Sequence, residues 1–362
     1  MQEKKKRTLS LVFALLAAVI FGMSFMFSKL ALEVAKPTVL LAFRFITAFA
    51  AMSLVIGVNA LVGKLRGRPL FAFSLKGKPI GSLILLGLIQ PVLYFFCENY
   101  GILYTSSAVA GTIIAVVPIA CILMDVLVLH EKVTRRQVVC AVLCIVGVAF
   151  IYMGGETHIS ALGLVFLLMT VGCDAVYYTL SHKAAERFTP FEVTYVMFTV
   201  GMLFFIPSAL IQGAGHMAET FLPAMQSGSF WGAVVYLGLV SSVVAYFLLN
   251  FANANLTVSE TSLFSNVTTV VSVLAGVVLL REPFGIWQII GVAVILVCVY
   301  AANTTPKKAA YSVIKNRPCG RFFYDAFMTF PPVSPVSAPS RMANTPLTST
   351  WVMPADSCCG SV

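Results

Sequence analysis

Six ionisable side chains lie inside long apolar stretches of this sequence, where they could bind or carry a charge. They are Lys29, Arg44, Glu98, Asp125, Asp174 and Glu260. An ionised side chain in the middle of a bilayer costs roughly 3 kcal/mol or more unless it faces a wet cavity or a partner. These residues are therefore the first candidates for a functional site.

Asp174 occupies the deepest position among these residues, near the middle of the segment TVGCDAVYYTL. Tyr177 and Tyr178 follow at helical spacing and share its helix face. A carboxylate at that depth can bind and release a proton as a cavity opens and closes, which would couple transport to protons. The alternative is a structural pair with a buried cation such as Arg44 or Lys29.

Arg44 and Glu98 have one functional and one structural interpretation each. Arg44 can hold a substrate carboxylate, or it can pair with a buried acid and fix helix packing. Glu98 and Asn99 lie beside Tyr94, and Asn99 is mirrored by Asn250 later in the chain. Mirrored polar residues suit paired gates, whereas a solvated interfacial carboxylate is the alternative for Glu98.

Glu260 opens the hydroxyl-rich segment TVSETSLFSNVTT, which also contains Asn266. These groups either line a polar pathway or hold helices together through hydrogen bonds. Lys29 lies near the end of its stretch and can reach the headgroups. The predicted substrate-binding or coupling residues are Asp174, Arg44, Glu98, Asn99, Tyr94, Tyr177, Tyr178, Asn250, Glu260 and Asn266.

The elements that must position these residues are membrane-spanning helices. Charged residues make up only 10% of the chain, and the mean hydropathy is +0.93. Because a helix needs about 20 apolar residues to cross a bilayer, the apolar stretches predict an all-α membrane protein with ten spans. The expected spans are Thr8–Leu32, Pro37–Val62, Pro79–Cys97, Ser106–Leu129, Arg136–Met153, Ser160–Ser181, Pro190–Gln212, Phe230–Asn250, Val258–Leu280 and Phe284–Ala302.

The chain repeats itself, so we expect two five-span repeats at 1–153 and 154–302. Residues 128–152 resemble residues 279–301 at an offset of 151, which pairs Glu131 with Glu282, and earlier positions match at 153. Both glutamates are expected to be structural, closing the turn between the last two helices of each repeat. Repeats of this kind in a polytopic protein are typical of transporters built around a central site.

Loop charges predict that the second repeat is inverted relative to the first. Sixteen basic residues fall in the expected inward loops, and only Lys36 and Arg281 fall in outward ones. The positive-inside rule then places both termini in the cytoplasm, with the chain in the cell membrane. The net charge of +10 thus reflects topology, and no nucleic-acid partner is expected.

The sequence resembles the EamA-like branch of the drug/metabolite transporter superfamily. The resemblance covers residues 8–302 and rests on the ten spans, on Pro37 followed by Arg44, on ENYGILYTSSAVAGTIIAVVPI at 98–119 and on the Glu–Lys or Glu–Pro corner of each repeat. It implies export or exchange of small metabolites, amino acids, amines or drug-like compounds, often against a proton gradient. Two positions depart from the internal symmetry. The repeat counterpart of Arg44 is the apolar Met197, and that of Asp174 is the apolar Phe21.

The leading hypothesis is a secondary active transporter of a small organic solute, working by alternating access within the lipid bilayer and linked to protons. The alternative is an integral-membrane enzyme acting on lipid-linked substrates, although the four histidines are scattered and no acidic cluster marks one face. We expect no cofactor, since no phosphate-binding loop occurs, and no metal, since the cysteines lie in apolar runs. Residues 303–362 are rich in proline and polar residues, which predicts a disordered cytoplasmic tail.

Overall fold

The computed structural model describes residues 2–129, 135–153 and 160–303, and in these ranges the chain is helical with no β-strand. The expected tail at 303–362 lies outside them except for Asn303. The first repeat contains α1 (Gln2–Leu32), α2 (Pro37–Arg66), α3 (Ile80–Gly87), the π-helical segment η1 (Leu88–Leu93), α4 (Tyr94–Tyr104), α5 (Ser107–Ile114), α6 (Val117–Leu129) and α7 (Arg135–Met153). The second contains α8 (Ala161–Ala184), α9 (Pro190–Gly213), α10 (Met217–Gln226), α11 (Gly228–Val235), η2 (Tyr236–Ala245), α12 (Tyr246–Asn253), α13 (Val258–Ser262), α14 (Ser265–Leu274), η3 (Ala275–Leu279) and α15 (Ile286–Asn303).

Eight of the helical stretches in the described ranges are long and apolar enough to cross a membrane. They coincide with the first four predicted spans and with the sixth to ninth. The other two predicted spans form shorter apolar helices, Val138–Met153 and Ile286–Ala302. The chain is thus an all-helical membrane protein, and the predicted count of ten depends on these two shorter helices.

Two helix starts are marked in the sequence by prolines at equivalent positions of the two repeats, Pro37 and Pro190. Each occupies the first turn of its helix, where the missing N–H would have no intrahelical partner. In α9 the preceding Thr189 and the following Glu192 form a reciprocal capping box. The helix α2 ends at Gly67, whose φ of 72° suits the left-handed conformation.

The short helix α10 was not expected from the sequence, which reads as a loop there. Ala224 is buried and Phe221 is half-buried, while the polar Glu219 and Gln226 are exposed together with Met217 and Leu222. The helix is therefore amphipathic, and it packs against α9 and α11 at one end of the bundle.

Several spans are interrupted along their length. Gln90 has φ −136° and ψ 101°, an extended conformation, because it precedes Pro91 within the third span. Pro118 lies in the first turn of α6, where it follows the break between α5 and α6. The ninth span also breaks, at Leu263 and Phe264, between α13 and α14. Interrupted spans leave backbone groups available within a membrane, which is typical of solute-binding regions.

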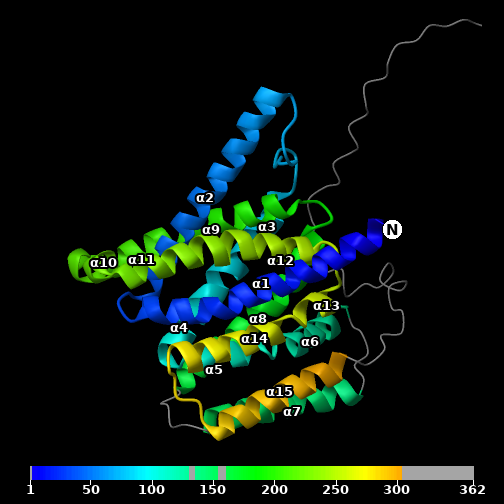
Figure 1. Ribbon diagram of the computed structural model, residues 1–362, viewed down its shortest axis with the longest axis vertical. Coiled ribbons are helices and arrows are strands. Elements are labelled where there is room, and N and C mark those ends of the chain that lie inside the picture. Colours follow the sequence, from blue (N-terminus) through cyan, green and yellow to red (C-terminus); the bar gives the residue numbers. More distant parts are fainter. Residues whose placement is uncertain (1, 130–134, 154–159, 304–362) are drawn as a thin grey trace, which may run out of the picture. The chain divides into compact units, whose positions relative to one another are not determined.

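The repeats pack in a reciprocal way (Figure 1). Helix α1 contacts α12 and α14 of the second repeat, and its counterpart α8 contacts α4 and α6 of the first. Likewise α2 packs on η2 while α9 packs on η1, and α7 lies beside α15. Each repeat therefore packs against helices of the other, and the interfaces between the repeats lie within the helix bundle.

Glycines allow two of these seams to close tightly. A Cβ added at Gly111 on α5 would lie 1.7 Å from Oγ and 2.4 Å from Cβ of Ser272 on α14. A Cβ at Gly22 on α1 would lie 2.6 Å from Cβ of Val271. Neither position leaves room for any side chain, so α14 is held close to both α5 and α1.

Candidate functional site

A small cavity lies between the repeats, and its polar lining contains two acidic side chains. Its volume is about 30 Å³, which is room for roughly two water molecules. The lining comes from α1, η1, α4 and α5 of the first repeat and from α8, α12 and α14 of the second. The lining residues are Phe21, Ser24, Phe25, Gln90, Tyr94, Phe95, Glu98, Ile114, Asp174, Tyr178, Tyr246, Leu249, Ser265 and Thr268.

Asp174 and Glu98 face this cavity from opposite repeats. Their exposed fractions are 8% and 3%, so both carboxyl groups are withdrawn from bulk water. They are close enough to interact electrostatically. Glu98 accepts a hydrogen bond from the Tyr94 hydroxyl at 3.2 Å, one helical turn away. Two acids sharing one enclosed site cannot both stay ionised without a cation or proton, so the arrangement is suited to binding one.

Gln90 connects the two sides of the cavity. Its Nε2 donates to the Tyr246 hydroxyl at 2.7 Å, and both it and Asp174 line the cavity. The Gln90 Oε1 and the Ser265 Oγ are buried without a partner in the described part of the chain. Both atoms belong to residues that line the cavity. The interrupted third and ninth spans thus supply polar atoms that a solute can use.

Arg44 lies near the site but does not line the cavity. Its Nε donates to Ser242 Oγ at 3.0 Å and its Nη2 to Ser241 Oγ at 3.1 Å, both in η2. The Phe95 ring covers the guanidinium at 4.0 Å and lines the cavity itself. Arg44 also interacts electrostatically with Glu98, although no ion pair with an acid occurs within 4.0 Å among the described residues.

Asn250 is the centre of a buried hydrogen-bond network below the cavity. Its Oδ1 accepts from the Tyr177 hydroxyl at 2.9 Å and from Ser181 Oγ at 2.8 Å, and its Nδ2 donates to Thr194 Oγ1 at 3.0 Å. The network therefore joins α8, α9 and α12. Its repeat counterpart Asn99 only donates to the Phe95 carbonyl in its own helix, at 2.9 Å.

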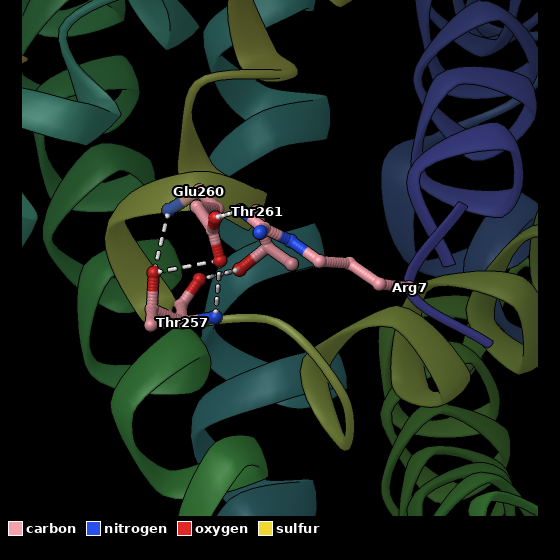
Figure 2. A network of polar contacts seen from close by, with 4 residues as sticks. All are labelled: Arg7, Thr257, Glu260 and Thr261. Atoms are coloured by element: carbon pink, nitrogen blue, oxygen red, sulfur yellow. Dashed lines mark hydrogen bonds and ion pairs between the residues drawn. The ribbon is translucent and has the colours of Figure 1, made fainter. Parts of the chain in front are cut away.

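Glu260 lies apart from the cavity, at the start of α13 (Figure 2). Its carboxylate accepts from the backbone N–H and the hydroxyl of Thr257, at 3.0 and 3.1 Å, as part of a capping box. Arg7 of α1 reaches it at 2.6 Å. Asn266 is half-buried near the break between α13 and α14, and its Oδ1 has no partner in the described ranges.

Glu282 joins the two repeats at the other end of the same span. Its carboxylate accepts from the N–H groups of Ser107 and Ala108, each at 2.9 Å, and from the Ser107 hydroxyl at 2.8 Å. It thereby caps α5 of the opposite repeat. Lys29 donates to the carbonyls of Ile102 and Thr105, each at 3.3 Å, at the end of α4. Glu131 and the side chain of Asp125 lie outside the described residues.

The structure thus brings four predicted residues to the cavity, Asp174, Glu98, Tyr94 and Tyr178, and it adds others that the sequence did not single out. Gln90 had a usable signal, because a polar residue before a proline in mid-span predicts a break. Ser241 and Ser242 also had a usable signal in the sequence. At an offset of 151 residues they are the repeat counterparts of Gln90 and Pro91, where the third span breaks. The cavity aromatics Phe95 and Tyr246 had none, because aromatic residues are frequent throughout the spans.

Comparison with models of known protein families gives one matching family, and its model matches this chain twice. The model of the EamA-like transporter family matches residues 8–153 and again residues 161–304. A solved crystal structure aligns with 80% of this chain and 99% of its own, at a TM-score of 0.51 and 21% identity, which shows a shared fold.

Curated relatives are also named as transporters. The uncharacterized transporter YcxC of Bacillus subtilis is 34% identical over 84% of this chain and 96% of its own length. A transporter of Archaeoglobus fulgidus is 23% identical over 79% of this chain and 95% of its own. A probable terminal-alkyne amino-acid exporter of Streptantibioticus cattleyicolor is 24% identical over 52% of this chain and 61% of its own.

Proposed function

This chain belongs to the EamA-like transporter family, and on that premise we propose that it exchanges a small organic solute for protons by alternating access. It is a multi-pass membrane protein that transports small molecules. The observation that carries the finer proposal is the small cavity between the repeats, with the buried carboxyl groups of Asp174 and Glu98 in its lining. Asp174 is the proton-coupling group.

The small volume of the cavity supports alternating access. A volume of about 30 Å³ is too small for an organic solute, so the helices must separate before one can enter. The reciprocal packing of the repeats supports an exchange of conformations that opens the site first to one side and then to the other. Binding a proton or a solute neutralises the buried carboxyl groups and so permits closure around the site.

The proposed setting is the cell membrane, with both termini in the cytoplasm and transport directed outward or by exchange. The distribution of basic residues between alternate loops supports this orientation. Reporter fusions at either terminus test it, since a reporter active only outside the cell would contradict the placement.

The test of the transport proposal is flux in proteoliposomes across a panel of amino acids, amines and drug-like compounds. Wild-type protein should move at least one solute faster when a pH gradient is imposed. Asp174→Asn should lose that acceleration, whereas Glu186→Gln, which alters an exposed carboxylate, should retain it. Unchanged proton-driven flux in Asp174→Asn would exclude Asp174 as the coupling group, and absence of flux for every solute would contradict the transport proposal.

A further inference from the structure

The ionised groups around the cavity do not cancel. Asp174 and Glu98 contribute two carboxylates, and Arg44 is the cation that interacts with Glu98. Arg44 is only 1% exposed and remains charged, because a guanidinium does not deprotonate in proteins. One negative charge is therefore left without a partner when both acids are ionised, and a site withdrawn from bulk water disfavours that state strongly.

The acceptor atoms in the cavity suit an ammonium group. An ammonium has three N–H donors and no acceptor. The lining offers the Asp174 carboxylate together with two buried oxygens that have no partner in the described ranges, Gln90 Oε1 and Ser265 Oγ. Aromatic rings of Phe21, Tyr178 and other residues surround these acceptors, and such rings favour both cations and apolar bodies.

The same lining contains no cationic side chain that could neutralise a carboxylate. The cation that interacts with the cavity carboxylate of Glu98 is Arg44, and the Phe95 ring lies over its guanidinium at 4.0 Å. Two of its nitrogens are occupied by Ser241 and Ser242. Its Nη1 has no partner in the described part of the chain, yet Arg44 does not line the cavity. A solute carboxylate would reach this atom only after displacement of Phe95.

We propose that the site binds one monovalent organic cation, an amine with an aromatic or aliphatic body, in electroneutral exchange for one proton, and that it rejects solutes bearing a carboxylate. This inference rests on the proposed function and specifies its substrate class. When the site opens, the proton on Asp174 leaves to water and the ammonium takes its place beside the carboxylate. Either occupant brings the cavity to neutrality, so either permits closure.

Other titratable groups interact electrostatically with Asp174 from several helices. They are Tyr177, Tyr178 and Cys173 on its own helix, Tyr94 and Glu98 on α4 and Tyr246 on α12. Beyond them, Cys97 interacts with Cys173, Cys121 with Tyr178 and Arg44 with Glu98. The phenols and thiols are neutral near pH 7 at their ordinary values, so only the two carboxyl groups and the guanidinium enter the charge balance.

The first test compares solutes that differ by one group. Proteoliposomes are loaded with tyramine, tyrosine or 4-hydroxyphenylacetate, which are an amine, an amino acid and an acid with the same body. Two further series repeat this comparison with a tryptophan-like body and with a linear six-carbon body. In at least one series the amine should exceed both carboxylated partners by about a hundredfold, because a buried carboxylate would lack a partner. Faster movement of an amino acid or acid than of its amine would overturn the inference while leaving the transport proposal intact. Absence of all flux would instead contradict the transport proposal.

The second test measures stoichiometry with wild-type protein. If one proton exchanges for one monovalent cation, net amine flux should stop when a pH difference of one unit is opposed by an amine concentration ratio of about tenfold. This balance point should not change when the membrane potential is varied with potassium and valinomycin. A balance point that moves with the potential would overturn the inference.

The third test alters the charge balance. Glu98→Gln leaves the cavity neutral without a proton, and Arg44→Gln leaves two negative charges uncompensated, so each single variant should lose proton-driven amine flux. The double variant restores one net negative charge and should recover flux relative to both. Folding is checked by gel filtration and thermal unfolding. A double variant that folds but stays inactive would contradict the proposed charge balance. If the double variant does not fold, the stoichiometry measured with wild-type protein in the second test decides whether the proposal holds.

Discussion

Asn250 shows how one polar side chain can fix the helices that support a site. It makes three hydrogen bonds, to Tyr177, Ser181 and Thr194, and so ties α12 to two neighbouring helices. Asn250→Ala should lower the free energy of unfolding by roughly 2 kcal/mol, because interhelical hydrogen bonds in membranes contribute about 0.6 kcal/mol each. Thermal or steric-trap unfolding in detergent measures this.

A matched control for this prediction is Asn255→Ala. Asn255 donates only to the Phe251 carbonyl in its own chain segment, at 2.6 Å. Its replacement should therefore cost much less than that of Asn250. Equal losses for the two variants would show that the network does not stabilise the contact between helices.

Phe95 determines, on our proposal, whether Arg44 can meet a solute. Phe95→Ala would remove the ring that covers the guanidinium and should raise the flux of an amino acid relative to its amine by roughly tenfold, since a charge-assisted contact becomes available. Paired flux measurements with tyrosine and tyramine report the ratio. Phe25→Ala removes another cavity ring without uncovering Arg44, and should leave the ratio unchanged.

At the residue scale, sequence reasoning succeeded where a charge stood in an apolar setting. Asp174 and Glu98 are conspicuous in the sequence for this reason, and both line the cavity. Arg44 was equally conspicuous, but its cover by Phe95 depends on side-chain packing that no pattern encodes. Glu260 belongs to a helix cap, which its position three residues after Thr257 would have indicated.

At the level of elements, the contact between α5 and α14 depends on a missing side chain. Gly111→Ala would place a methyl group within 2.4 Å of Ser272 Cβ, so the helices must separate, at a cost of about 2 kcal/mol. Loss of thermal stability and of flux should follow. Ser272→Gly in the same molecule removes the obstructing atoms and should restore both.

The control for this pair is Gly172→Ala on α8, where no atom lies within 4 Å of the added methyl group. This variant should keep wild-type stability. A Gly111→Ala protein as stable as Gly172→Ala would mean that the close approach of α5 and α14 is not required.

The elements themselves were largely predictable. Apolar length and the repeated prolines gave the eight long spans, because bilayer thickness imposes a minimum length on a helix. The breaks were not predicted, although Pro91 and Pro118 marked two of them. The break at Leu263 and Phe264 has no proline, and α10 is an amphipathic segment too short to be recognised among loop residues.

For the molecule as a whole, contacts between repeats occur at both ends of the span Val258–Leu279. Glu260 at its start meets Arg7, and Glu282 just past its end caps α5. The proposed alternating access requires that the repeats separate at one end while they stay joined at the other. These two contacts are therefore suited to act in opposition.

The two contacts should differ in strength. The Arg7 side chain is 65% exposed, so its ion pair with Glu260 is worth less than about 1 kcal/mol. Glu282 makes three hydrogen bonds to a helix start, and Glu282→Ala should cost about 1 to 2 kcal/mol. The end that carries Arg7 is thus expected to open more readily.

Hydrogen exchange can test this difference. Arg7→Gln should speed amide exchange at the start of α13 by less than about fivefold, and Glu282→Ala should speed it at the start of α5 by about tenfold. Arg7→Lys keeps the ion pair and should leave exchange near the wild-type rate. Equal effects at both helices in either variant would argue against two independent contacts.

The volume of the cavity bears on energy conservation by the cell. Protons hop rapidly along unbroken files of water, but a space of about 30 Å³ holds roughly two molecules. On our proposal, Asp174 then keeps its proton in the closed state without passing it onward through solvent. A carrier of this design would stay in the membrane at high copy number without short-circuiting the proton gradient that we propose drives it.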